Sequence, residues 1–285
     1  MTDAPAGRPL LDVDGLTVTF PSPEGRLAVV RDFALTMGRE KIGIVGESGS
    51  GKSITARSIL GLVREPGAVT ARRLRLDGTD LLALDASGWR ALRGRKVGMI
   101  LQDPKFSLNP VQRIGDQIEE TLRLHERTSR SERRARALAM LEAVGIEDPE
   151  RMYRAYPHEL SGGMGQRAMI AAMLVSSPDL LIADEPTSAL DVIVREQVLR
   201  LLDRLVAERG LGLILISHDL PMVARFCDRI LVMYRGRVVE TLDARRLSDA
   251  AHPYTRGLLA CLPSAATRGR LLPTLARDAA WEIAP

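Results

Sequence analysis

The sequence has few cysteines and no long apolar run. Its 285 residues include two cysteines, Cys227 and Cys261, which lie far apart and form no CxxC pair. We therefore expect neither a disulfide framework nor a cysteine-held metal cluster, and a reducing, cytosolic compartment fits. No window approaches the roughly 18 consecutive apolar residues of a membrane-spanning helix. The first residues lack a basic segment leading into an apolar run, so we expect no secretory signal.

Charge of one sign is not in large excess either. Lysine and arginine number 40 against 36 aspartates and glutamates, which leaves a net charge of +4. This mild basicity allows contact with nucleic acid or an anionic membrane but requires neither, so an ordinary solvated surface is the simpler interpretation. Hydrophobic residues make up 45% and charged residues 27% of the chain, which is typical of a soluble globular protein with a substantial core.

A glycine-rich loop lies between an apolar run and a helix-compatible segment. Residues 42–45 are typical of a buried strand, residues 46–53 read GESGSGKS, and residues 54–62 favour a helix that ends near Gly61. This order of strand, loop and helix is the context that a phosphate-binding loop requires. An ordinary glycine-rich turn is the alternative, but it does not need the Lys-Ser pair at its end.

Such a loop binds phosphates through its backbone. The glycines let successive N–H groups and the positive end of the next helix point at the α- and β-phosphates of a nucleotide. Lys52 then reaches the β- and γ-phosphates, and the Ser53 hydroxyl ligates Mg²⁺. The predicted nucleotide contacts are Gly46, Ser48, Gly49, Ser50, Gly51, Lys52 and Ser53.

Two later strands are predicted to end in polar side chains. The apolar run 97–101 leads to Gln102, and the run 180–183 leads to Asp184 and Glu185. Polar groups at the carboxyl ends of strands in an α/β sheet are well placed to meet a ligand. Asp184 suits the Mg²⁺ shell, and Glu185 suits a base or water-positioning role. Gln102 either touches Mg²⁺ or the attacking water, or simply caps a loop.

Two further segments are candidates for contact with phosphate, one at a strand end and one at a helix start. The apolar strand 211–217 ends at His218, for which we predict a γ-phosphate contact rather than a purely structural role. Ser161 is suited to the N-cap of a helix, and Gly162 and Gly163 allow close approach by an anion. Taken alone, the Ser-Gly-Gly turn carries little information.

Antiparallel strands are predicted before the glycine loop. Residues 16–20 and 27–30 alternate in polarity on either side of the turn-prone stretch 21–25. Phe20 is either an aromatic platform for an adenine ring or a strand residue in a core.

Helical periodicity replaces alternation over residues 115–157, which we interpret as a helical insertion between two strands of the core. Ser129 followed by Glu132 forms a capping-box pattern, and Gly145 ends the same helix. Four arginines of this helix are predicted to form a solvated face, with a partner surface as the alternative: Arg130, Arg133, Arg134 and Arg136.

Together these stretches resemble the ATP-binding subunit of an ABC transporter. The resemblance covers roughly residues 11–240 and includes six motifs in the right order. They are the Walker A loop (46–53), the Q-loop (Gln102), the signature motif (160–164), Walker B (180–185), the D-loop (188–191, with Asp191) and the switch histidine (His218).

The resemblance implies an α/β fold, a P-loop NTPase core of the ABC ATPase type with a mainly parallel sheet. An antiparallel β subdomain, a helical subdomain and a C-terminal extension would complete it. We expect the ATPase domain over residues 8–240, with residues 103–159 as the inserted helical subdomain and residues 241–285 as an accessory tail. The implied cofactors are ATP and Mg²⁺, and the implied reaction is attack of water on the γ-phosphate. Two such domains stack head to tail in this family, with ATP between the loop of one and the Ser-Gly-Gly of the other.

Several details are similar to the peptide and nickel importers in particular. They are Gln102-Asp103-Pro104, residues 107–110, Met164, and the sequence HPYT at residues 252–255. This similarity implies a paralogous second ATPase subunit, two permeases, an indirect link to a solute-binding protein, and no nucleic acid. It places the chain at the cytoplasmic face of the inner membrane. A cysteine-rich segment found in many subgroup members is missing. The alternative is an ATPase component of a soluble complex unrelated to transport.

Overall fold

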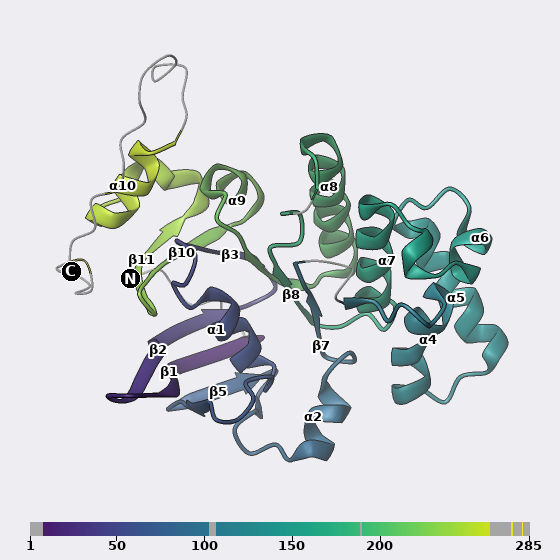
Figure 1. Cartoon of the computed structure of the whole chain (residues 1–285), viewed down its shortest axis with the longest axis horizontal. Helices are drawn as coiled ribbons and strands as arrows, with labels where there is room; N and C mark the ends of the chain where they lie inside the picture. Colours follow the sequence, from purple (N-terminus) through teal and green to yellow (C-terminus); the bar gives the residue numbers. More distant parts are fainter. Residues whose placement is uncertain (1–7, 103–106, 189, 263–274, 276–280, 282–285) are drawn as a thin grey trace. The chain divides into compact units, whose positions relative to one another are not determined.

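The computed structural model describes residues 8–102, 107–188, 190–262, 275 and 281. Of the positions singled out above, Asp103, Pro104 and Ala189 lie outside the described residues. The chain forms two compact units (Figure 1). The first contains the chain up to Leu82 and again from Leu215, and the second contains the chain from Ala83 to Ile214.

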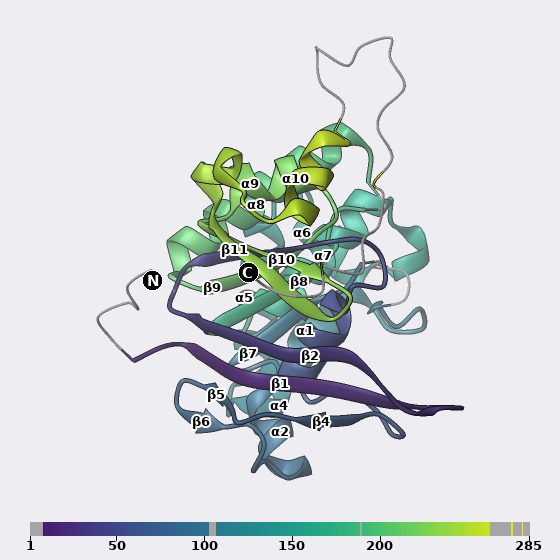
Figure 2. The ribbon, with the colours of Figure 1, turned by 90° about the vertical axis from the view of Figure 1, so that its left-hand side faces the viewer.

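The first unit begins with a long antiparallel hairpin, whose two strands lie side by side in Figure 2. Its register runs from Leu11 opposite Met37 to Ser22 opposite Gly25. Alternate side chains are buried on each side of a register shift, Leu11 and Val13 before it and Leu16 and Val18 after it. The hairpin and its neighbours confirm the predicted antiparallel layer. The strands of this layer are β1 (Leu11–Ser22), β2 (Gly25–Met37), β4 (Ala68–Thr70), β5 (Arg73–Leu76) and β6 (Thr79–Asp80).

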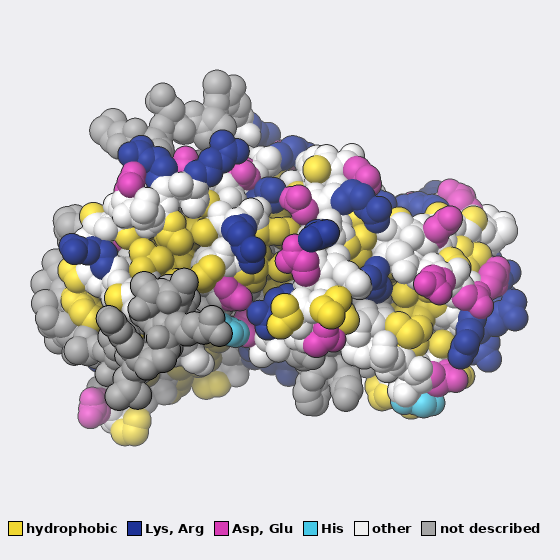
Figure 3. Space-filling model, turned by 90° about the horizontal axis from the view of Figure 1, so that it is seen from above, with side chains coloured by type: hydrophobic (Ala, Val, Ile, Leu, Met, Phe, Trp, Pro, Cys, Tyr) yellow, Lys and Arg dark blue, Asp and Glu magenta, His cyan; other side chains and the backbone are white. Residues whose placement is uncertain are grey.

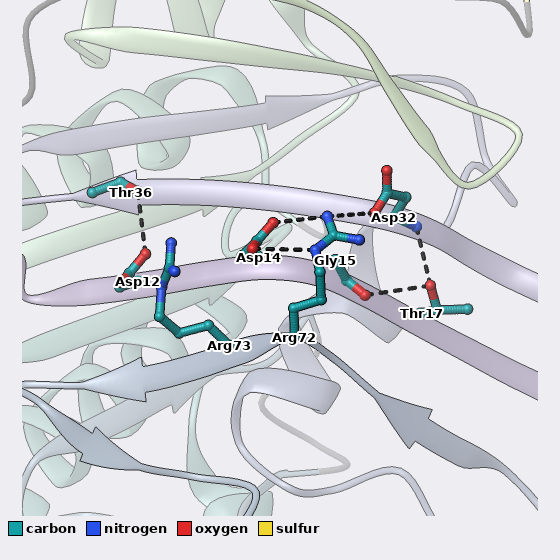
Figure 4. A network of polar contacts seen from close by, with 8 residues as sticks. All are labelled: Asp12, Asp14, Gly15, Thr17, Asp32, Thr36, Arg72 and Arg73. Atoms are coloured by element: carbon teal, nitrogen blue, oxygen red, sulfur yellow. Dashed lines mark hydrogen bonds and ion pairs between the residues drawn. The ribbon is translucent and has the colours of Figure 1, made fainter.

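A cluster of ion pairs marks the point where β1 departs from regular pairing (Figure 4). Arg72 donates from Nε and Nη2 to the two carboxylate oxygens of Asp14, at 3.2 and 2.8 Å, and from Nη2 to Asp32 at 2.9 Å. The hydrogen bond from Arg72 lowers the pKa of Asp14. Because Arg72 and Asp32 are exposed and Asp14 is only half-buried, the pairs add little stability, but they join three segments beside the irregular register.

A parallel pair of strands carries the glycine loop in the same unit. β3 (Lys41–Val45) pairs with β10 (Arg229–Tyr234) in parallel, and β10 forms an antiparallel hairpin with β11 (Arg237–Asp243). Ile42 to Val45 are buried, as the apolar run predicts. The helix after the loop, α1 (Lys52–Ile59), begins two residues earlier and ends sooner than the predicted 54–62.

The rest of the first unit lies after β9 (Gly212–Ile216), the strand on which the chain crosses back from the second unit. Helix α9 (Leu220–Phe226) follows β9, and its Val223 is fully buried. Within residues 241–262, which belong to the predicted accessory tail and are described, the chain forms the 3-10 segment η2 (Ala244–Asp249) and the helix α10 (Pro253–Ala260).

The second unit combines a parallel strand pair with a group of helices. β7 (Val97–Ile100) pairs in parallel with β8 (Leu180–Asp184), which confirms both predicted strands. The remaining elements are α2 (Ala86–Leu92), α4 (Ile114–His125), α5 (Arg130–Ala143), α6 (Pro149–Arg154), η1 (Pro157–Glu159), α7 (Gly162–Leu174) and α8 (Val192–Arg209). In the described part of the chain, every helix is too short or too polar to cross a bilayer.

The arginines of α5 correct one prediction. Ser129 caps the helix as expected, since its hydroxyl accepts from the Glu132 N–H at 3.2 Å. Arg133 and Arg136, however, are not simply solvated. Arg133 pairs with Glu119 of α4, and Arg136 pairs with Glu126, the residue that caps the end of α4. The sequence pattern predicted the helix and its cap, but it carried no information about carboxylates on other segments.

The packing of α9 on β3 gives a stability prediction. A Cβ atom added at Gly43 would lie 2.1 Å from Cγ1 of Val223, so Gly43→Ala forces overpacking that costs about 1–3 kcal/mol. Adding Val223→Ala removes the clash. We expect the free energy of unfolding of the double variant to be about 1 kcal/mol higher than the sum of the two single effects predicts. Urea unfolding followed by circular dichroism would measure it. Strict additivity would show that α9 does not pack on Gly43.

Candidate functional site

The glycine loop joins the end of β3 to the start of α1 in a conformation that only glycine adopts readily. Gly46 has a φ of 149°, and a Cβ added there would lie 2.2 Å from the carbonyl oxygen of Met233. Gly51 caps α1 with a φ of 101°, and its Cβ would lie 2.8 Å from the carbonyl oxygen of Val29. The neighbouring strands therefore press against the loop backbone and leave no room for side chains at these two positions.

Lys52 directs its charge into this loop. Its side chain is 6% exposed, and Nζ donates to the carbonyl oxygens of Gly46 and Glu47, each at 2.8 Å, and to the Ser50 hydroxyl at 3.3 Å. A buried ammonium needs such acceptors, because an unpaired charge in the interior is costly. Ser53 follows in the first turn of α1, whereas the sequence pattern placed it at the end of the loop.

The β10–β11 turn holds the glycine loop through backbone hydrogen bonds. The Gly236 N–H donates to the Ser50 carbonyl oxygen at 3.0 Å, and the Arg31 N–H donates to the Gly236 carbonyl oxygen at 2.7 Å. Neither contact follows from local sequence patterns, because β2, the loop and the turn are far apart in the chain.

His218 lies at the carboxyl end of a strand beside β3. The Ser217 N–H, one position before it, donates to the Ile44 carbonyl oxygen of β3 at 3.2 Å. The Ser217 hydroxyl in turn accepts from the Asp219 N–H at 3.0 Å. The bond from Ser217 to β3 brings His218 to the same strand ends from which the glycine loop leaves. His218 itself is exposed there.

Phe20 lies on β1 opposite Leu27. A Cβ atom added at Gly67 would lie 2.7 Å from its ring, so the ring lies against the backbone there. This contact leaves both interpretations of Phe20, as a base platform and as a strand residue, open.

The second unit brings Gln102 and Glu185 together. Ile100 of β7 pairs with Ala183 of β8, so the residues two positions further along each strand end up side by side. Gln102 Nε2 donates to Glu185 Oε2 at 3.4 Å. Asp184, the last residue of β8, is 6% exposed.

Glu185 adopts an unusual backbone conformation. Its φ is 48°, a region that residues other than glycine rarely occupy and that stores strain of about 1–3 kcal/mol. Its carbonyl oxygen accepts from both the N–H and the hydroxyl of Ser188, at 3.3 and 3.2 Å, which holds the turn. Such strain is often found at functional sites, where it aims a side chain.

The predicted signature residues and Asp191 lie at two helix starts in the same unit. The Ser161 hydroxyl accepts from the Met164 N–H at 3.4 Å and caps α7, as predicted. A Cβ atom added at Gly163 would lie 2.9 Å from Val194 of α8, so glycine lets the two helix starts approach. Gly162, next to it, is exposed.

Asp191 has a structural role that the sequence reading missed. Its carboxylate accepts from the N–H groups of Ile193 and Val194, each at 3.0 Å, and caps α8. An aspartate directly before an apolar helix is a general signal for such a cap. No group of three or more metal-binding side chains of the His, Cys, Asp or Glu types occurs among the described residues.

Comparison with models of known protein families identifies the family of the chain. The family model described as ABC transporter matches residues 31–188, which include the glycine loop, Gln102, the Ser-Gly-Gly turn and Glu185. The chain belongs to the ABC transporter family. It is an ABC-type ATPase, and its α/β fold is that of an ABC ATPase core.

Relatives and solved structures agree with this family. A putative peptide import ATP-binding protein of Brucella melitensis is 45% identical over 90% of this chain and 78% of its own length. The dipeptide transport ATP-binding protein DppD of Escherichia coli K12 is 46% identical over 89% of this chain and 78% of its own length. A dimeric bacterial ABC transporter cassette, MJ0796, superimposes with a TM-score of 0.74 at 32% identity, covering 82% of this chain and 99% of the cassette.

Proposed function

We propose that this chain is the ATP-hydrolysing subunit of an ABC importer for peptides. The observation that carries the chemistry is the glycine loop, in which carbonyl groups hold the Lys52 ammonium at the start of α1. The peptide cargo rests on the names of the two relatives above, which are peptide and dipeptide transport proteins. Those relatives give no support for nickel, the other cargo that the resemblance implied.

The glycine loop would bind the phosphates of ATP. The backbone N–H groups of Ser48 to Gly51 and the positive end of α1 would surround the phosphate oxygens, and Lys52 would neutralise their charge. Mg²⁺ would offset further charge on the phosphates. The proposal keeps Ser53, Asp184 and Gln102 as its candidate ligands, because each carries the oxygen donor that Mg²⁺ prefers.

Glu185 would orient or deprotonate the attacking water. The positive φ of Glu185 and the hydrogen bond that its carboxylate accepts from Gln102 support this role. Gln102 would report on the state of the site to the helical subdomain, and His218 would contact the γ-phosphate. The base contact of Phe20 and the domain limits 8–240, 103–159 and 241–285 also remain part of this proposal.

The proposed assembly has two ATPase chains and two permeases. The superimposable MJ0796 cassette is dimeric, which supports a head-to-tail pair in which Ser161, Gly162, Gly163 and Asp191 of one chain meet the nucleotide of the other. A second solved relative, cbiO1 of Clostridium perfringens, is part of an ABC transporter complex; it is 25% identical with a TM-score of 0.72 and covers 85% of this chain and 92% of its own. A paralogous partner chain, a solute-binding protein and the cytoplasmic face of the inner membrane are proposed from the resemblance.

Nucleic acid is not part of the proposed assembly. The resemblance stated above implies none. On the face shown in Figure 3, basic and acidic side chains are interspersed among the described residues.

A single substitution tests the role of Glu185. Glu185→Gln keeps an oxygen that accepts from Gln102 but removes the base, so we expect ATP binding to persist while turnover falls by about 10²- to 10⁴-fold. Phosphate release and ATP affinity would be measured on the same preparation. The matched control is Glu196→Gln on α8, an exposed glutamate that pairs with Arg200. Normal hydrolysis by Glu185→Gln would remove Glu185 from the mechanism.

Co-purification tests the transport function. Tagged protein would be recovered from detergent-solubilised native membranes, and the bound proteins would be identified by mass spectrometry. The importer proposal predicts two permeases and a second ATPase. Recovery of soluble enzymes alone would leave the ATPase chemistry in place and favour a soluble complex unrelated to transport.

A further inference from the structure

The C-terminal helix α10 makes a direct contact with the glycine loop. The hydroxyl of Tyr254, a residue with no exposed surface, accepts a hydrogen bond from the backbone N–H of Glu47 at 3.0 Å. Glu47 is the second residue of the loop, and 207 positions separate it from Tyr254. Nothing in the proposed mechanism uses this contact.

The contact falls on the peptide group that also holds Lys52. The carbonyl of Gly46 and the N–H of Glu47 belong to one planar peptide unit. Lys52 Nζ donates to that carbonyl at 2.8 Å, and the Tyr254 hydroxyl accepts from the N–H, which points in the opposite direction in the same trans peptide unit. Rotation of this plane would break both bonds, so the tyrosine hydroxyl restricts where the lysine acceptor can point.

Tyr254 is itself held firmly by the chain before it. Glu240 of β11 accepts through Oε1 from the N–H groups of Ala251 and His252, at 2.6 and 3.1 Å. His252, which is 3% exposed, caps α10 by accepting at Nδ1 from the Tyr254 N–H at 3.2 Å. These bonds fix the start of α10 relative to β11 and thereby fix the tyrosine ring.

Aromatic packing adds a second restraint. The Tyr254 ring lies 4.5 Å from the ring of Tyr234, the last residue of β10, and 5.9 Å from that of Trp281. Tyr234 directly precedes the turn that supports the loop at Ser50. Its own hydroxyl is buried and has no hydrogen-bond partner in the described part of the protein.

We propose that Tyr254 is a positioning residue for nucleotide binding, which acts through the Gly46–Glu47 peptide on Lys52. The segment after β11 is then part of the nucleotide site rather than an appendage, and displacement of α10 lowers the affinity for ATP. This inference rests on the proposed role of the glycine loop in binding the phosphates of ATP.

Tyr254→Phe in the full-length chain tests the inference, because phenylalanine keeps the ring packing and removes only the hydroxyl. The dissociation constants of ATP and ADP would be measured by titration calorimetry well below the unfolding temperature of each variant. We expect both constants to rise about three- to tenfold, the effect of losing one hydrogen bond, at unchanged binding stoichiometry. A purely structural role would instead lower the unfolding temperature or the binding-competent fraction and leave the dissociation constant unchanged.

Two control variants separate the possible outcomes. Tyr234→Phe removes the neighbouring hydroxyl that lacks a partner, so its nucleotide affinity should match that of the natural chain. Lys52→Ala should lose most of its affinity. If Lys52→Ala binds ATP normally, the proposed function of the loop is wrong. If Lys52→Ala loses ATP and Tyr254→Phe binds it with the natural affinity, only the inference about Tyr254 is overturned.

Discussion

The buried ammonium of Lys52 is the constraint on which the rest of the first unit depends. A charge that is almost fully removed from water must be surrounded by acceptors, and here the acceptors are two loop carbonyls and a hydroxyl. The loop presents those carbonyls because Gly46 takes a conformation closed to other residues and lies against Met233. The β10–β11 turn at Ser50 and the tyrosine of α10 at Glu47 hold the same loop at two further points.

A different constraint, strand register, organises the second unit. The pairing of Ile100 with Ala183 brings Gln102 to the side chain of Glu185, and the turn through Ser188 holds Glu185 in its strained conformation. The α7 and α8 helix starts approach each other because Gly163 has no side chain. In the proposed mechanism, the first unit would therefore bind the phosphates of ATP, and the second would supply the carboxylate that acts on the attacking water.

Local patterns in the sequence predicted most of the fold. Apolar runs identified β3, β7 and β8, and the glycine loop was placed correctly between strand and helix. Local reasoning failed where a partner is distant in the chain. The arginines of α5 meet carboxylates that the helical pattern does not reveal, and the hydrogen bond between Tyr254 and Glu47 spans 207 positions. Asp191 was assigned to the site from the resemblance, while its capping bonds follow from its position before α8.

A structure of the Glu185→Gln protein with ATP and Mg²⁺ would test the central claim most directly. The account predicts the phosphates within hydrogen-bonding distance of the loop N–H groups and of Lys52 Nζ, with the Glu47 N–H still donating to Tyr254. Phosphates bound away from the loop would contradict the account of Lys52. A Glu47 N–H turned from Tyr254 towards a phosphate would contradict the account of the peptide that holds it.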